Sequence, residues 1–582
     1  MTHYSDAMTD ADAMNEQGRP DSEPPVSATG PLTVTSTITN TVTVTVTAVS
    51  TLVAMGLAVL RLRHGLALVG DSGSYLAGAS GIADGRWFET PLVPSFSEIP
   101  LLDTVNEAGW SSYTDFGVGT PLFIALFDLF LPLRHAAGAV NVLAIGFIAA
   151  AVMVGPWTPR RRSELVARSI LAVALSCWPI LRFTGVGVLS EPVFCAAVVW
   201  LAVMLGRLSP PSPGTHSLRT PGARSRDVLR HDVQSPGAVE PCTPVLIVLG
   251  VLTVIAGFTR FVGPTVAVVA AILLVGSGVS WRRAGWWFLA TGFAPTAVTA
   301  LASRGTRTWS FHSRSTDDIF FLARGVGGWF EAGMGDQTST LLRQSFRPSL
   351  VHWAIALAAA TGAIVVMGTW FRDIRDTRRG SPLSPAMILA TALALVVVPS
   401  MFFLDAILKL ENRIMMPSGV LVISAAGWWL AGKASVPLAI GGVCLWAVVA
   451  THPWNWLERP APSRPTALTA AVEELELRYG VRYVLTTQAD LVWWHTGVPA
   501  RYLPSGYYNR SDRTYDPQPL MAALPCALAR NDGAIVVDVN MVLPAPVILE
   551  EQLSLDVTAG RYDRVEITPG IVAYQPTGLG CD

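Results

Sequence analysis

Acidic residues gather in one polar stretch of the sequence, residues 61–118, which follows the first long apolar segment. They are Asp71, Asp84, Glu89, Glu98, Asp103, Glu107 and Asp115. A carboxylate held against a reacting hydroxyl can act as a general base. Asp71 is the first acid after the apolar segment, and a stretch so rich in carboxylates beside a membrane is where we expect chemistry. Alternatively, Asp71 only caps a helix beginning at Ser72.

Three more charged residues stand at the ends of apolar segments: Glu191 in GVGVLSEPVF, Arg260 in AGFTRFVGP and Arg413 in LKLENRIMMP. Charges at such positions are costly and by default indicate function. Because guanidinium groups bind phosphate bidentately, we predict that the two arginines bind a phosphate and that Glu191 contacts substrate. The alternatives are that Glu191 caps its helix and that the arginines reach anionic lipid headgroups.

Aromatic residues cluster near the C-terminus in DLVWWHTGVPARYLPSGYY. Aromatic faces can stack on sugar rings, which predicts acceptor binding by Trp493, Trp494, His495 and Tyr502. The alternative is a packed core strand followed by a tyrosine-rich loop, since aromatic side chains dominate small cores.

The composition indicates that a membrane positions these residues. Of 582 residues, 51% are hydrophobic and 14% are charged, against about a quarter charged in soluble proteins. The mean hydropathy is +0.44. The chain is therefore predicted to be a mainly α, multi-span membrane protein. No strongly basic domain is present, which argues against a nucleic-acid partner.

Apolar runs of the length needed for a membrane helix, about 20 residues, recur along the chain. The first, TVTVTVTAVSTLVAMGLAVL, alternates Thr and Val like a strand, but a lone strand cannot satisfy its backbone in lipid. The sequence predicts about eleven spans: 41–60, 136–156, 164–183, 187–207, 244–261, 264–280, 285–303, 350–371, 383–404, 414–431 and 435–451.

Basic clusters predict the orientation, because short cytoplasmic loops collect Lys and Arg. Four clusters fall on one face when the helices alternate: residues 160–162, the linker 208–243, residues 281–283 and residues 372–379. This places the stretch 61–118, the loop 304–349 and everything after 452 outside the plasma (inner) membrane. Arg61 and Arg63 are exceptions, because they follow the first span on the predicted outer side.

Three regions follow from this scheme. Residues 1–40 are predicted to be a disordered cytoplasmic tail, since they are acidic and poor in clustered apolar side chains. Residues 41–452 form the transmembrane domain, and residues 453–582 form a small extracytoplasmic α/β domain. Cys526 and Cys581 both fall in the last region, where an oxidising compartment would allow a disulfide.

Five motifs, GDSGSYLAGA, YTDFGVGTPLFIALF, LSEPVF, FTRFVG and ENRIMMP, occur in this order between residues 41 and 452. Together they resemble the GT-C superfamily of integral membrane glycosyltransferases. The branch in question is related to protein O-mannosyltransferases and to bacterial enzymes that move sugars from polyprenyl phosphates. The chain departs from that pattern at Ile414, where the family often has Tyr, and at Ser72, where some members have a second acid.

The resemblance implies transfer of a sugar from a polyprenyl phosphate to a glycan, lipid or protein hydroxyl outside the membrane, with inversion. Asp71 would be the base, Arg260 and Arg413 would neutralise the phosphate, and Tyr75 and Asp115 would contact substrate. A divalent cation bridging Asp71 to the phosphate is left open, since no ligand cluster requires one. The alternatives are a flippase or transporter of lipid-linked or small polar substrates, and a non-catalytic assembly protein of the envelope.

Overall fold

The computed structural model describes residues 32–63, 65–68, 72–87, 89–90, 92–93, 111–112, 117–159, 161–208, 243–260, 262–295, 297–298, 382–403, 412–433, 465–503, 518–539 and 553–578. The predicted spans 350–371 and 435–451 lie outside these residues. The chain divides into two compact units, Met1–Thr45 and Val46–Asp582. The elements below belong to the second unit, except for the first part of α1.

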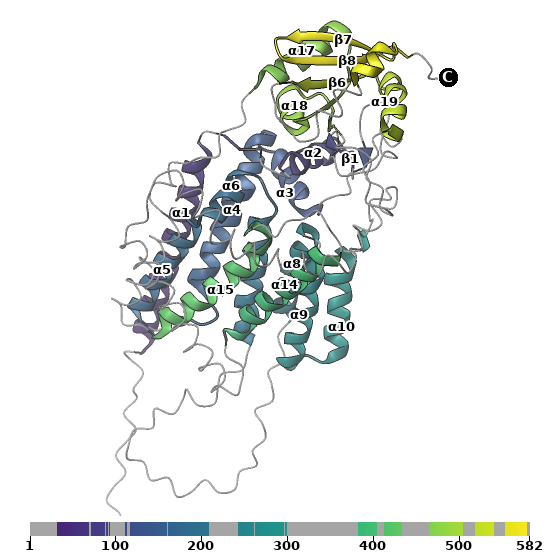
Figure 1. Cartoon of the computed structure of the whole chain (residues 1–582). Helices are drawn as coiled ribbons and strands as arrows, with labels where there is room; N and C mark the ends of the chain where they lie inside the picture. The colour runs from purple at the N-terminus through teal and green to yellow at the C-terminus, as the bar shows by residue number, and fades with distance from the viewer. Residues whose placement is uncertain are drawn as a thin grey trace, which may run out of the picture. The chain divides into compact units, whose positions relative to one another are not determined.

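Three described helices are long and apolar enough to cross a membrane: Asn40–Leu62 within α1 (Leu32–Leu62), α4 (Leu133–Val154) and α7 (Glu191–Leu208). The first of them confirms a helix, rather than a strand, for the Thr-Val repeat. Further helices lie beside them (Figure 1). These are α2 (Ser72–Ala83), α3 (Gly119–Asp128), α5 (Arg162–Ser176), α6 (Pro179–Val186), α8 (Thr243–Thr259), α9 (Gly263–Gly276), α10 (Trp281–Phe288), α14 (Ser384–Phe403) and α15 (Asn412–Lys433).

Two predicted spans differ from single regular helices. The prediction of one helix over 164–183 is wrong, because α5 ends at Ser176 and α6 begins at Pro179. A residue that precedes proline is driven out of the α region, which explains the break. The helix α10 continues as a π-helix, η2 (Leu289–Phe293), where the prediction had one regular span over 285–303.

Helix α7 is the most enclosed of the long helices and packs against α4, α8, α14 and α15. Its sequence is apolar all round, which is typical of a helix buried among others rather than facing solvent on one side. The N-terminal end of α7 is buried, which puts Glu191 inside the protein, whereas Arg207 near its C-terminal end is exposed.

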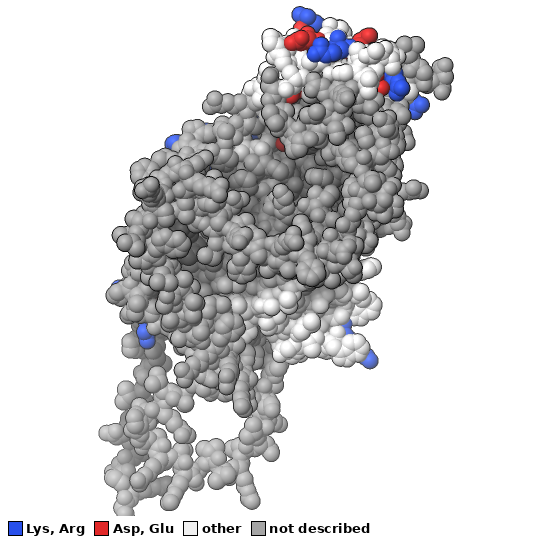
Figure 2. All heavy atoms as spheres, in the orientation of Figure 1, with Lys and Arg blue, Asp and Glu red and all other residues white. Residues whose placement is uncertain are grey.

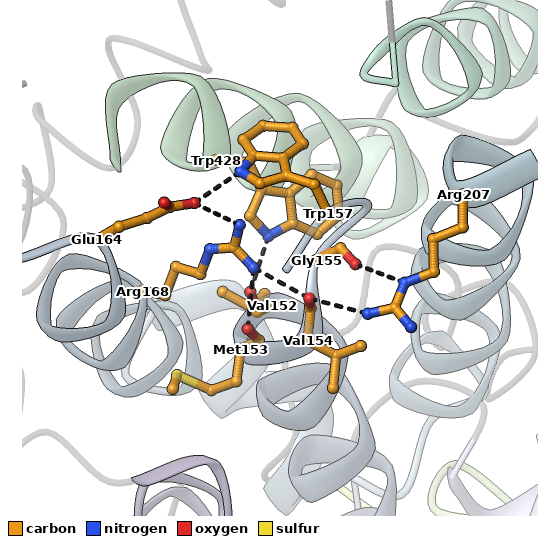
Figure 3. A network of polar contacts seen from close by, with 9 residues as sticks. All are labelled: Val152, Met153, Val154, Gly155, Trp157, Glu164, Arg168, Arg207 and Trp428. Carbon is orange, nitrogen blue, oxygen red and sulfur yellow. Dashed lines mark hydrogen bonds and ion pairs between the residues drawn. The ribbon is translucent and has the colours of Figure 1, made fainter. Parts of the chain in front are cut away.

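The C-terminal end of α4 is held by side chains from three other helices (Figure 3). A helix leaves its last four carbonyls without intrahelical partners; here they belong to Ala151, Val152, Met153 and Val154. The first accepts from the Gly155 N–H at 2.9 Å. Gly155 has φ +57° and ends the helix.

The other three carbonyls accept hydrogen bonds from side chains. Trp428 Nε1 donates to Val152 O at 2.8 Å, and Arg168 Nη1 donates to the next two carbonyls at 3.1 and 3.0 Å. Arg168 Nη2 also pairs with Glu164 Oε1 at 2.7 Å. We call this arrangement, with Arg207 Nη2 at 3.3 Å from Val154 O, the α4 clamp.

The C-terminal region forms a six-stranded sheet in the order β2-β5-β4-β6-β8-β7. Strands β5 (Ala500–Tyr502), β4 (Tyr483–Thr486) and β6 (Gly533–Asp538) are parallel, whereas β8 (Ile571–Pro576) and β7 (Tyr562–Thr568) continue antiparallel. Strands β4 and β6 lie in the apolar runs VRYVLTT and GAIVVDV. With the helices α17 (Ala467–Tyr479) and α19 (Gln518–Arg530), they give this region the mixture of helices and strands that was predicted for it.

The edge strand β2 (Leu92–Val93) comes from the acidic stretch and pairs in parallel with β5. A second pair of short strands, β1 (Glu89–Thr90) and β3 (Ser111–Ser112), also lies in that stretch. Figure 2 shows acidic and basic side chains side by side on the sheet region. On α17, the exposed Arg478 pairs with Glu474. Such a mixed surface is typical of a domain that faces water.

Candidate functional site

Residues from three separate segments meet at the N-terminal end of α7. Tyr75, on α2, donates a hydrogen bond from its hydroxyl to Ser190 Oγ at 3.0 Å. Ser190 immediately precedes α7, and Glu191 is the first residue of that helix. Both Tyr75 and Ser190 are buried, at 4% and 1% exposure. The hydrogen bond therefore ties α2 to the start of α7.

Glu191 forms an ion pair with Arg260, the residue that follows α8. Arg260 Nη1 lies 3.1 Å from Glu191 Oε1, and the two side chains are 14% and 2% exposed. The helix dipole favours a carboxylate at the N-terminus of α7. We call Tyr75, Ser190, Glu191 and Arg260 the α7 site; it lies at the end of the bundle that the charge pattern predicts to be extracytoplasmic.

The α7 site keeps unused hydrogen-bonding capacity. Glu191 Oε2 is buried and accepts no hydrogen bond from the described residues, and Arg260 Nη1, although close to Glu191, does not meet hydrogen-bond geometry. A guanidinium carries five N–H donors. Leaving buried polar groups unpaired costs about 1–3 kcal/mol each, so the site is suited to a ligand that offers both an anion and a hydroxyl.

The backbone that enters α7 is strained. Val188 has φ +47° and is 1% exposed. A β-branched residue in the left-handed region is a steric outlier, and such strain costs on the order of 1–3 kcal/mol and collects at functional sites. Neither Val188 nor Ser190 was among the residues predicted from the sequence. Serine before a helical apolar run is an N-cap signal that could have indicated Ser190, whereas nothing indicates Val188.

Of the other predicted site residues, Asp71 and Asp115 lie outside the described residues, so their roles stay predictions. Helix α2 begins at Ser72, directly after Asp71. Arg413 is in the first turn of α15, and its side chain is not described. One turn further, the Met416 sulfur lies 3.7 Å from Thr184 Oγ1 of α6, the helix that leads toward Val188. The start of α15 is thereby packed close to the segment that enters the α7 site.

The predicted acceptor-binding aromatics lie on α18 (Ala489–Thr496) and β5, so the alternative of a core strand for the WWHT segment is wrong. Trp493 is 7% exposed and packs in the apolar core. The Trp494 ring lies 4.7 Å from the Arg134 guanidinium, which also donates to Trp494 O at 3.3 Å. His495 is on the same helix, and the side chain of Tyr502 is not described. Sugar binding by these residues stays a prediction.

The described residues contain no group of three or more His, Cys, Asp or Glu side chains that could hold a metal ion. At the α7 site the one carboxylate present, Glu191, is already paired with a guanidinium, which does not fit a cation. We therefore derive no step through a metal. Cys526 is disulfide-bonded, whereas Cys581 lies outside the described residues, so their pairing stays a prediction.

No protein-family model and no curated protein matches the chain. Among solved structures, the chain is similar to the archaeal oligosaccharyltransferase AglB from Archaeoglobus fulgidus in complex with an inhibitory peptide and a dolichol-phosphate. The identity is 11% and the TM-score 0.47, over 92% of this chain and 74% of that one. The same oligosaccharyltransferase in complex with Zn and sulfate gives 11% identity and a TM-score of 0.45, over 92% and 74%.

A third similar structure is ArnT from Cupriavidus metallidurans bound to undecaprenyl phosphate, at 12% identity and a TM-score of 0.39, over 94% of this chain and 98% of that one. The resemblance of the five sequence motifs to the GT-C superfamily stays a prediction. At this low identity and TM-score, no substrate, partner or residue role is carried from these proteins to this chain.

Proposed function

We propose that the chain is a membrane glycosyltransferase that moves a sugar from a polyprenyl phosphate to an acceptor hydroxyl outside the membrane. The observation that carries this proposal is the buried Glu191–Arg260 pair at the start of α7. It joins a cation with free donors to a carboxylate oxygen without a partner, at the end of an apolar helix bundle. A lipid phosphate that bears a sugar offers the matching groups: an anion, hydroxyls and an apolar tail.

In the proposed reaction, the acceptor oxygen attacks the anomeric carbon while the bond from that carbon to the phosphate oxygen breaks, which inverts the centre. The acceptor proton passes to the carboxylate of Asp71, a step of the kind worth about 10² to 10⁴-fold in rate. The polyprenyl phosphate leaves with one more negative charge. Arg260, with Arg413, stabilises that charge by hydrogen bonds that strengthen as it develops.

Glu191 has two parts to play in this scheme. Its Oε1 holds the Arg260 guanidinium in place, and its Oε2 accepts a hydrogen bond from a hydroxyl of the donor sugar. Tyr75 and Ser190 fix the start of α7 against the segment that carries Asp71. Arg260 is 14% exposed, and in this proposal its remaining N–H groups bind the phosphate.

The test uses the full chain in nanodiscs with a polyprenyl-phosphate sugar and a hydroxyl acceptor. Transfer is expected from the wild type, with loss of at least 100-fold in Asp71→Asn and little change in the matched control Asp84→Asn, an exposed acid of the same stretch. Movement of the sugar lipid across the bilayer without transfer, unaffected by Asp71→Asn, would instead establish the flippase. No turnover and no translocation by the wild type would leave the non-catalytic envelope protein.

A further inference from the structure

The turn that carries Arg260 is enclosed by glycines from two sides. On its own side, Gly263 begins α9 and packs against the last turn of α8, where an added Cβ would lie 2.5 Å from Ala256 O. Arg260 N donates to that same oxygen at 3.2 Å, and Gly263 N donates to Arg260 O at 2.9 Å. Only a residue without Cβ fits such an approach, so the α8–α9 turn has little freedom.

The second side comes from a distant part of the sequence. The segment that begins α3 crosses the last two residues of α8, just before Arg260. A Cβ on Gly117 would lie 2.7 Å from Thr259 O and closer still to Phe258 O, and one on Gly119 would lie 2.8 Å from the Phe258 carbonyl carbon. Real Cβ atoms essentially never come within 3.0 Å of backbone. Any side chain at either position would therefore push α8 and α3 apart.

We infer that Gly117 and Gly119 are positioning residues for the Arg260 guanidinium: by allowing backbone contact between α3 and α8 they set its distance from Glu191. Both glycines belong to the motif YTDFGVGTP, in which Asp115 precedes Gly117 by two residues. The same close crossing thus fixes the point where the end of the acidic stretch meets the phosphate-binding arginine. The inference rests on the proposed function and adds residues that touch no substrate themselves.

The experiment is a double-mutant cycle in nanodiscs, with the donor kcat/KM and the acceptor KM as readouts. Gly117→Ala is expected to lower donor kcat/KM by about 10 to 100-fold, since misplacement by about 1 Å can cost that much, and to leave the acceptor KM unchanged. Arg260→Lys keeps the charge but loses the planar fork. Because the glycine acts through Arg260, adding Gly117→Ala to the Arg260→Lys variant should change the donor kcat/KM by no more than about 2-fold.

The control is Gly276→Ala at the end of α9, where an added Cβ has nothing within 4 Å; it should match the wild type. Should Gly117→Ala fold poorly, Gly119→Ala takes its place, because its added Cβ lies less close to the α8 backbone. The same loss of donor kcat/KM is expected from it. Independent, multiplying effects of the glycine and arginine substitutions would overturn the inference, as would a Gly117→Ala enzyme with wild-type kinetics.

A substrate-free arm separates this inference from the proposed function. The shifts in Tm caused by Gly117→Ala and Arg260→Lys should be less than additive in the double variant, because both substitutions weaken the same Glu191–Arg260 ion pair. If the wild type shows no transfer but this coupling is present, the proposed function fails and the positioning stands. If transfer occurs but both cycles are additive, the function stands and the positioning is refuted.

Discussion

The Glu191–Arg260 pair should respond asymmetrically to loss of either partner. The two charges are 3.1 Å apart, and the carboxylate side chain is 2% exposed against 14% for the guanidinium. At an effective dielectric constant of about 20, that distance corresponds to an attraction of about 5 kcal/mol. Removing one partner of a buried pair costs about 3–5 kcal/mol, because an unpaired charge stays buried.

Arg260→Gln leaves the more enclosed charge without a partner, so the free energy of unfolding should fall by about 3–5 kcal/mol. Glu191→Gln leaves a guanidinium that can extend toward water or headgroups on its long stem. We expect a smaller loss, about 1–2 kcal/mol, from that variant. The double variant should resemble Glu191→Gln alone, since replacing both charges removes the unpaired group.

The assay is reversible unfolding in mixed micelles, with the pair Arg478–Glu474 as the matched control. That pair is closer, at 2.8 Å, but its side chains are 69% and 32% exposed. Arg478→Gln should therefore cost no more than about 1 kcal/mol. A larger loss for Glu191→Gln than for Arg260→Gln, or strictly additive losses in the double variant, would refute the view that burial of Glu191 decides the energetics.

Three further substitutions test other contacts. Arg134→Ala and Trp494→Ala should lower the free energy of unfolding less than additively in the double variant, because the ring and the guanidinium are mutual partners. A sugar platform would instead weaken acceptor binding only in the tryptophan variant. Arg61→Gln should cost about 0.5–2 kcal/mol and leave the orientation unchanged in a cysteine-accessibility assay. Burial, and secondarily Asp556, raises the pKa of Tyr562. The free energy of unfolding should therefore fall as the pH rises above about 10, the pKa of tyrosine in the unfolded chain. Thermal unfolding should show a smaller fall for the Tyr562→Phe variant.

The exception to the charge pattern at Arg61 has a structural explanation. Its Nη1 donates to Ser176 O at 2.8 Å, at the end of α5, and its Nη2 lies 3.2 Å from Cys177 Sγ. A cation at a helix C-terminus meets the negative end of the dipole. Arg61 is thus used within the bundle as a cap. A count of basic residues could not reveal this, because α5 is about a hundred positions away in the sequence.

The sequence predicted those helices and strands that depend mainly on residues close together in the chain. The run 466–480 predicts α17, and Thr466 and Thr469 form its capping box. The break before Pro179 also had a sequence signal, which the hydropathy of 164–183 concealed. In contrast, β2 has two residues and exists only because β5 offers it an edge, so no sequence pattern could predict it. Pairings of this kind depend on contacts between distant segments.

For the candidate site, the sequence predicted individual residues but not the contacts between them. Sequence reasoning chose Tyr75, Glu191 and Arg260 separately, on residue type and position at apolar ends, and the structure brings all three to the start of α7. It could not predict which residue partners which. It also missed Val188, since a valine with positive φ contradicts local preference and persists only where the surrounding fold imposes it.

A charge inside an apolar bundle is not by itself a functional signal, and a comparison of Arg168 with Arg260 shows what distinguishes a structural cation from a candidate for ligand binding. Arg168 is 0% exposed, yet its terminal nitrogens are used by two carbonyls and by Glu164. Arg260 has one ion pair, outside hydrogen-bond geometry, beside a carboxylate oxygen without a partner in the described chain. Since unpaired donors in a buried site cost free energy, a fold keeps them where a ligand supplies the missing acceptor. The Nη groups of Arg168 are all used, and only its buried Nε has no hydrogen-bond partner among the described residues, which fits a structural role for the α4 clamp. The Nη1 of Arg260, which makes no hydrogen bond there, fits the phosphate that we propose for the α7 site.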